Sequence, residues 1–349
     1  LLNDGTLRAA ELLGRGMSAG IGYGTLETLN IRLGAAGDSF TIESTHGQTT
    51  NLYANGGGDT VNVQTIAGAT NLYAGTGDDT INVGSLAPAT GGNVNGIGAA
   101  LYLAGQDGTD TLNVDDTGDG AANDGTLTGT TLTGLGMAGG ITYATLETLN
   151  VALGSGGDTF TVESTHSRTT NVRANDGDDT IAVNAIQGQT TIFGGNGNDT
   201  FLVDTLPTLI GDANGDGLRD TLDLHDEAGS DTYTINITGS GDYIVNVLDN
   251  GGDDGTDTLT VYGTEEADTF LLRASENSSG IAFVAALHGD PVAEVERINY
   301  DQKLEQLTVA AQGGDDKVTL DDNWTETTIQ GGAGADTFQV GQIFKSRRD

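Results

Sequence analysis

The sequence predicts an all-β chain that folds as a right-handed parallel β-solenoid, a β-helix with coils of about 20 residues. Three observations support this fold class. Aspartates in Gly-rich loops recur about every 20 residues, a short stretch of alternating apolar and polar residues follows each loop, and a longer unit of about 120 residues repeats. Such recurrence is typical of solenoids, in which one coil buries its apolar face only against its neighbours.

The longer repeat divides the chain into modules. Residues 3–7 reappear as 123–127, and residues 25–30 as 145–150, without a gap between them. A looser third copy begins near Ile298. We therefore expect a first module at 1–122, a second at 123–230, variant coils at 231–297 and the start of a third module at 298–349.

Within each module the shorter period predicts the strands. Asp38, Asp59 and Asp79 follow one another at intervals of about 20 residues, and the second module repeats these intervals. Alternation with a period of two, as at residues 80–83, marks a half-buried strand. Each coil then consists of a strand, a turn, a second strand and a Gly-Asp loop. The apolar side chains expected to face inward are Val61, Val63, Ile81 and Val83, with Thr and Asn between them facing outward.

Residues 231–297 have no counterpart in the first module. Two strand-like stretches at 269–273 and 281–284 flank a turn at 275–280 that contains Ser, Asn and Gly. This pattern predicts a β-hairpin inserted between coils.

Composition excludes several classes of partner. The 349 residues include 56 Gly, no Cys, and 13 Lys plus Arg against 50 Asp plus Glu, which gives a net charge of −37. Such a chain lacks the basic residues that bind nucleic acid or anionic membranes, and it has no apolar run of about 18 residues for membrane insertion. Disorder is the alternative for so acidic a chain. The periodicity favours a folded chain whose charge cations neutralise.

The loops have the composition of calcium sites. Two of them, at 194–202 and 331–339, match Gly-Gly-x-Gly-x-Asp-x-apolar-x in full, and six others keep Gly-x-Asp. Calcium takes six to eight oxygen ligands from carboxylates and carbonyls, and Gly permits the tight turn that directs them. The nonapeptide resembles the repeats of RTX, or hemolysin-type, calcium-binding proteins. One loop per coil predicts calcium along one edge only; the alternative is a solvated Gly-Asp turn.

A second pattern lies at 212–223, where oxygen donors occupy positions 1, 3, 5, 9 and 12 with Gly at position 6. This is the pattern of an EF-hand loop, and it resembles the loops of dockerin-type modules. The alternative is another coil loop, because residues 220–224 align with 110–114.

The expected cofactor is Ca²⁺, several ions in all. The candidate ligands are Gly57, Asp59, Gly77, Asp78, Asp79, Asp107, Asp110, Asp176, Asp178, Asp179, Gly195, Asn196, Gly197, Asp199, Asp212, Asn214, Asp216, Asp220, Asp223, Asp254, Asp257, Asp315, Asp316, Gly332, Gly334 and Asp336.

Function is expected to be structural rather than enzymatic. A catalytic site should be singular, yet His46 and His166 occupy equivalent repeat positions. The resemblance implies a segment of a giant extracellular or cell-surface protein, such as an adhesin, surface layer or matrix fibre, with neighbouring copies of the repeat as partners. The chain begins and ends within a module, so we expect a longer protein. The alternatives are a module that binds polysaccharide or another surface, and a β-helix polysaccharide lyase or epimerase. The first would use Tyr53, Tyr73 and Phe193 as an aromatic ladder that Arg173 interrupts.

Overall fold

The computed structural model describes residues 4–14, 16–204, 206–209, 211–212, 215, 217–251, 255–274, 280–289 and 294–341. These residues form 31 β-strands, and among them there is no helix, so none that could span a membrane. The chain divides into two compact units, the first comprising residues 1–160 and 168–175 and the second 161–167 and 176–349. The division does not coincide with the modules expected from the repeat.

Two sheets of 17 and 14 strands contain all the strands. In the first unit the 17-stranded sheet contains β1 (Gly5–Arg8), β2 (Glu11–Gly14), β3 (Ile21–Gly22), β5 (Ser39–Ile42), β7 (Thr60–Val63), β9 (Thr80–Val83), β11 (Thr111–Asp115), β15 (Thr148–Ala152) and β17 (Thr169–Asp176). The 14-stranded sheet contains β4 (Thr28–Arg32), β6 (Thr49–Tyr53), β8 (Thr70–Thr76), β10 (Leu101–Asp107), β12 (Asp124–Leu127), β13 (Thr131–Gly134), β14 (Ile141–Ala144) and β16 (Thr159–Val162).

The second unit contains the remaining strands. The 17-stranded sheet contains β19 (Thr190–Asn196), β21 (Leu222–Asp226), β23 (Tyr243–Asp249), β25 (Thr269–Ala274), β26 (Ile281–His288), β27 (Glu294–Asp301), β29 (Lys317–Leu320) and β31 (Thr337–Val340). The 14-stranded sheet contains β18 (Thr180–Val183), β20 (Thr200–Val203), β22 (Thr232–Asn236), β24 (Thr258–Tyr262), β28 (Gln306–Ala310) and β30 (Glu326–Gln330).

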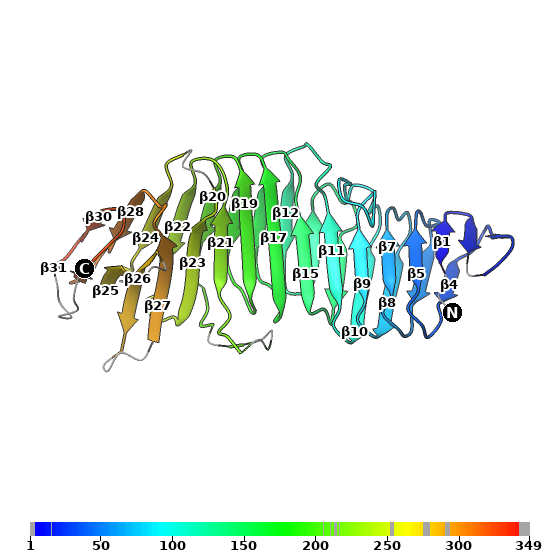
Figure 1. Cartoon of the computed structure of the whole chain (residues 1–349), viewed down its shortest axis with the longest axis horizontal. Coiled ribbons are helices and arrows are strands. Elements are labelled where there is room, and N and C mark those ends of the chain that lie inside the picture. The colour runs from blue at the N-terminus through cyan, green and yellow to red at the C-terminus, as the bar shows by residue number, and fades with distance from the viewer. Residues whose placement is uncertain are drawn as a thin grey trace. The chain divides into compact units, whose positions relative to one another are not determined.

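Coils stack in register, as the alternating pattern predicts. Strand β7 pairs in parallel with β5 and β9, and the three lie side by side in Figure 1. Val61, Val63, Ile81 and Val83 are at most 1% exposed, which confirms their inward orientation. On the other face, Asn side chains donate to those of the preceding coil, as Asn82 Nδ2 does to Asn62 Oδ1 at 3.0 Å. The all-β class and the parallel, repeated strands are therefore confirmed.

The regular spacing holds for some coils only. Strands β7 and β9 begin at Thr60 and Thr80, as the repeat predicts, but the next strand of the sheet, β11, begins only at Thr111. Likewise β20 begins at Thr200, and its neighbour β22 begins only at Thr232. The longer coils add residues to the loops while the strands keep their parallel pairing. Insertions therefore leave the ladder intact.

Successive modules place the same sequence on different sheets. Residues 25–30 and 145–150 are identical, yet β4 belongs to the 14-stranded sheet and β15 to the 17-stranded sheet. The reason is a count: between β4 and β15 the chain changes sheet nine times, an odd number. A module therefore contains an odd number of half-coils.

This exchange makes the prediction of Gly-Asp loops along one edge wrong. In the first unit Asp38 precedes β5 of the 17-stranded sheet, whereas Asp158 precedes β16 of the 14-stranded sheet. In the second unit Asp199 precedes β20 of the 14-stranded sheet, whereas Asp316 precedes β29 of the 17-stranded sheet. Because the coil strands of a sheet are parallel, these two kinds of loop lie at opposite edges.

The inserted hairpin is confirmed and is larger than expected. Strands β25 and β26 pair antiparallel, and β26 also pairs antiparallel with β27. The outer two strands return to the parallel sheet, since β27 pairs with β23 and β25 with β29. The turn residues 275–279 lie outside the described residues.

Candidate metal centre

The aspartates of the Gly-x-Asp loops are buried and form hydrogen-bonded columns, which we call carboxylate ladders. In the first unit Asp38 N donates to Asp59 Oδ1 at 2.6 Å, and Asp59 N donates to Asp79 Oδ1 at 2.7 Å. Asp79 N then donates to Asp110 Oδ1 at 2.9 Å. Each carboxylate thus accepts the backbone N–H of the same position one coil earlier.

The second unit contains two ladders. One runs through Asp179, Asp199, Asp231 and Asp257, with N–H to Oδ1 distances of 2.6–2.8 Å. The other runs through Asp268, Asp316 and Asp336, with distances of 2.8 and 3.1 Å. Sequence reasoning had not singled out Asp231 or Asp268. The loop of Asp268 departs from the Gly-x-Asp spacing, whereas Gly229-Ser230-Asp231 keeps it, so this spacing could have found Asp231.

Glutamates occupy the same acceptor position in the Leu-Glu motifs. Glu147 Oε2 accepts from Asp110 N at 2.8 Å, and Glu305 Oε2 accepts from Asp257 N at 2.7 Å. Leu146 and Leu304 beside them are both 4% exposed. The looser third copy therefore reproduces a structural role of the second, a role that the sequence alone had not assigned.

The glycines of the motif allow the coils to approach closely. Gly197 has a φ of +136°, and a Cβ placed there would lie 1.9 Å from Gly177 O in the preceding coil. A Cβ at Gly194 would lie 2.3 Å from Asp199 Oδ2, where the carboxylate turns back. Asp199 is only 1% exposed, so the carboxylate of this loop is not solvated, and the choice between a calcium site and a metal-free turn stays a prediction.

The ladder leaves several carboxylate oxygens buried without a hydrogen-bond partner among the described residues. These are the Oδ2 atoms of Asp59, Asp79, Asp110, Asp199 and Asp316. Burial raises the pKa of Asp59 and Asp110 to about 6, and that of Asp199 to about 7. A buried charge of this kind is costly unless a proton or a cation compensates it.

Other predicted ligands point away from the ladders. The exposed Asp78, Asp178 and Asp315 each accept a backbone N–H from the next coil, at 2.9, 2.8 and 2.9 Å. Asp107 is exposed, and the exposed Asp176 accepts from Asn196 Nδ2 at 2.7 Å. The glycines Gly57, Gly77, Gly195, Gly332 and Gly334 all have positive φ, the backbone conformation expected for the tight turn of the motif.

The loop at 212–223 leads into strand β21, and both the EF-hand pattern and the coil loop stay predictions for it. Asp212 accepts from Gly215 N and Gly217 N at 2.8 and 2.9 Å. Asp220 is buried and precedes β21. Asp223 lies within that strand, and its carboxylate accepts from Gln189 Nε2 at 2.7 Å.

Two of the remaining ligands of this loop, Asn214 and Asp216, lie outside the described residues. The same is true of Asp254 in the loop before β24. For these three positions, as for the other candidate ligands, the calcium assignment stays a prediction.

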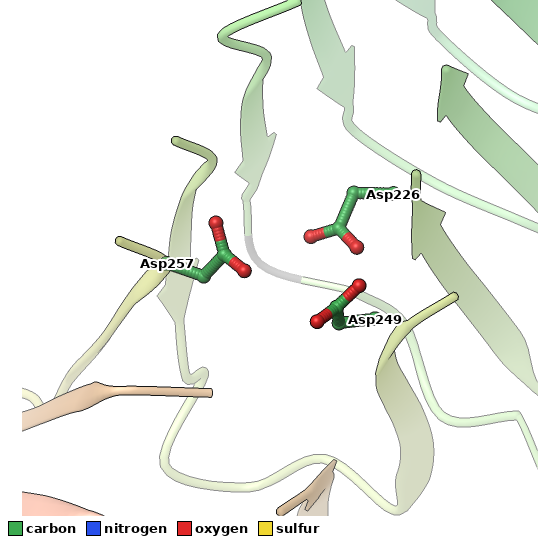
Figure 2. Close-up of side chains that lie close together, drawn as sticks. All are labelled: Asp226, Asp249 and Asp257. Atoms are coloured by element: carbon green, nitrogen blue, oxygen red, sulfur yellow. The ribbon is translucent and has the colours of Figure 1, made fainter. Parts of the chain in front are cut away.

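Three carboxylates converge at one place, which we call the triad: Asp226, Asp249 and Asp257. One oxygen of each lies within 4.8 Å of the others, and no other group of three His, Cys, Asp or Glu side chains among the described residues does so. Figure 2 shows the three carboxylates facing one another. Asp226 ends β21 and Asp249 ends β23, where the two are partners in the parallel register, while Asp257 precedes β24.

Only Asp257 of the triad was predicted. Asp226 and Asp249 end apolar-polar stretches and lie outside the Gly-x-Asp motifs. The signal that could have found them is their equivalent position at the ends of two neighbouring strands. Burial raises the pKa of Asp226 well above its usual range, and the charges of Asp231, Asp257 and Asp249 raise it further.

No known protein-family model and no curated protein matches the chain. The donor chemistry nonetheless suits a hard cation, because carboxylate oxygens are the ligands that calcium prefers. At the ladders, the carboxylate oxygen without a hydrogen-bond partner in each coil would need backbone carbonyls to complete a calcium site. At the triad, three carboxylates already lie close together.

Proposed function

We propose that this chain is a calcium-stabilised structural segment of a large secreted or cell-surface repeat protein, folded as a closed, right-handed parallel β-solenoid. Its role is mechanical: it extends an adhesin, surface layer or matrix fibre and associates with neighbouring copies of the same repeat. The resemblance of the loops at 194–202 and 331–339 to RTX repeats supports the calcium and the extracellular location.

The observation that carries the proposal is the burial of like charges in register. Asp59, Asp79 and Asp110 are each at most 2% exposed, and in all three one oxygen has no hydrogen-bond partner within the described part of the chain. With a net charge of −37, the folded chain needs counter-charge at these positions. Calcium at millimolar extracellular concentration supplies it, and binding then couples to folding.

Circular dichroism tests this function. In calcium the chain should give a β spectrum with a cooperative thermal transition, and excess chelator should abolish the β signal. Magnesium at equal concentration serves as the ionic-strength control, since its rigid octahedral preference suits these loops poorly. A chain that keeps both spectrum and transition in chelator contradicts the proposal.

A second candidate function, polysaccharide binding, is favoured by one observation. The rings of Tyr53 and Tyr73 stack at 5.1 Å with an interplanar angle of 7°, and Tyr102 continues the row at 5.7 Å. Arg32 covers Tyr53 at 4.2 Å. Beside them Asn51 Nδ2 donates to Asn30 Oδ1 at 2.8 Å. Tyrosine hydroxyls at the ends of stacked rings, beside amides, offer hydrogen-bonding groups for sugar hydroxyls.

The membership of this aromatic row differs from the prediction. Phe193 lies in β19 of the 17-stranded sheet and stacks on His225 at 4.8 Å, so its alignment with Tyr53 and Tyr73 is wrong. Arg173 lies in β17 of the same 17-stranded sheet and therefore does not interrupt the tyrosines. The odd number of half-coils per module explains both corrections.

Affinity electrophoresis through neutral and acidic polysaccharides tests this second function. The chain should be retarded by at least one of them, and Tyr73→Ala should remove most of the retardation while Phe193→Ala leaves it unchanged. Equal migration of the chain and the Tyr73→Ala variant in every gel contradicts polysaccharide binding at this row.

A further inference from the structure

We propose that the triad of Asp226, Asp249 and Asp257 is a discrete calcium site that ties together the irregular coils before the inserted hairpin. It goes beyond the proposed function because two of its three ligands, Asp226 and Asp249, come from strand ends and not from Gly-Asp loops. Only Asp257 is shared with a carboxylate ladder.

The geometry suits one ion. Two ligands of the same ion can be no further apart than twice the metal–oxygen distance, which is about 4.6–5.2 Å for calcium. The three carboxylate oxygens lie within 4.8 Å of one another. All of them are hard oxygen donors, and soft donors that would favour zinc are missing from the group.

An independent observation points to a ligand. Asp226 is 1% exposed, its Oδ1 has no hydrogen-bond partner among the described residues, and in Figure 2 its carboxylate faces the other two. Its second oxygen accepts from Tyr233 Oη at 2.5 Å. The buried Tyr233 hydroxyl therefore orients the Asp226 carboxylate and leaves its other oxygen available. Metal ligands are commonly oriented by such second hydrogen bonds.

Local cations do not balance the charge. Lys303 Nζ lies 3.9 Å from Asp249 Oδ1, but it also donates to Gly251 O at 2.7 Å and is 48% exposed. Asp301 adds a further carboxylate, since its Oδ2 accepts from Asp249 N at 3.1 Å. One lysine therefore faces four acids, and a divalent ion would restore most of the balance.

The site also has an access route. Asp249 lines a cavity of about 650 Å³ together with Lys303, Glu305, Trp324 and Glu326. Asp249 therefore belongs both to the triad and to the lining of this cavity, through which an ion can reach the triad. The acidic lining favours cations over anions.

The role follows from the coils that the ligands join. Coils here are irregular: β24 begins at Thr258, and the next strand of its sheet, β28, begins only at Gln306. Asp226 and Asp249 come from neighbouring coils, and Lys303 follows β27 of the next. An ion at the triad would fix the register where the regular repeat is lost.

Terbium luminescence tests the inference, because Tyr233 beside Asp226 can sensitise a bound Tb³⁺ ion. The full chain should show saturable emission that calcium displaces. Asp226→Asn and Asp249→Asn should each lower the affinity of this site at least tenfold while the β circular-dichroism signal persists. Asp124→Asn, at an exposed aspartate outside the ladders and the triad, is the matched control and should leave the emission unchanged.

The outcomes separate this site from the loops. Emission lost in the triad variants alone supports the inference even if the ladders bind no calcium. Emission that is the same in Asp226→Asn, Asp249→Asn and the unmodified chain overturns it, although calcium could still stabilise the Gly-Asp loops.

Discussion

The carboxylate ladders and the triad are built from the same residue type in the same pair of sheets, but their chemistry differs. In a ladder one oxygen of each aspartate accepts a hydrogen bond from the backbone N–H of the preceding coil. Successive carboxylates therefore stay one coil apart, as between Asp199 and Asp231. In the triad Asp226 ends its strand directly beside Asp249, and Asp257 approaches both from the following loop.

The difference shows what determines whether a buried aspartate accepts a hydrogen bond from a backbone N–H or lies beside other carboxylates. Regular coils present one acid per layer, and the peptide N–H of the layer before is its nearest donor. Where a strand end adds a second acid per layer, as Asp226 and Asp249 do, the carboxylates meet one another instead. In this chain the regular coils give hydrogen bonds to the backbone, and the irregular coils around β21 and β23 bring three carboxylates together at the site proposed for calcium.

The largest expected effect comes from forcing two ladder coils apart. Gly197→Ala should destabilise the chain by more than about 4 kcal/mol, because its Cβ would overlap a backbone carbonyl and its φ is positive. Thermal unfolding in calcium measures it. Gly47→Ala is the control, since a Cβ there meets nothing within 4 Å. Equal transitions for the two variants would mean that close stacking does not define the ladder.

Asp116 is a buried acid that belongs to neither the ladders nor the triad, so it tests the effect of burial without the convergence of several carboxylates. Asp116 is 0% exposed, its Oδ1 accepts from Val94 N at 2.9 Å, and burial raises its pKa to about 7. Because this pKa is raised by folding, the stability contributed by the neutral acid is complete below the unfolded pKa and is lost as pH rises through the folded pKa.

Asp116→Asn should therefore be more stable than the unmodified chain by about 2–4 kcal/mol near pH 8, and the advantage should shrink as the pH falls toward about 5. Urea denaturation at the two pH values in chelator measures it. An advantage independent of pH would indicate that Asp116 is ionised at both pH values. Burial alone would then not raise the pKa of an aspartate in this fold.

Replacing a single ladder aspartate should change the free energy of unfolding by an intermediate amount. Asp199→Ala removes the acceptor of Asp179 N and should cost about 1–3 kcal/mol. Asp199→Asn keeps an acceptor oxygen and removes the charge, so it should be stabilising in chelator and destabilising in calcium. His166→Ala, by contrast, should weaken local order less than Asp199→Ala, as amide hydrogen exchange would show. Comparable losses would mean that the loop motif has been misinterpreted.

The repeat in the sequence was sufficient to predict the strands and the inward apolar columns, because both follow from local alternation. It also located Asp59, Asp79 and Asp199, although their buried hydrogen bonds to backbone N–H groups became visible only in the structure. The sheet exchange could not be predicted, since it depends on how many half-coils residues 84–100 and 123–144 occupy. The triad required the register between β21 and β23, across a coil that keeps no regular spacing.

The smallest expected effect on stability comes from replacing an exposed aspartate, Asp78, next to a buried one in the same loop. Asp78 precedes the ladder residue Asp79 and likewise accepts a backbone N–H, that of Thr109 at 2.9 Å, but both Asp78 and Thr109 are exposed. Asp78→Ala should change the free energy of unfolding by less than about 1 kcal/mol, because water replaces the lost acceptor. Asp79→Ala, one residue away, should cost more, since Asp59 N would lose its buried acceptor. Urea denaturation of the pair in calcium compares them. If Asp78→Ala were the more damaging variant, the cation would have to lie among the outer carboxylates, and the buried ladder would be only a backbone cap.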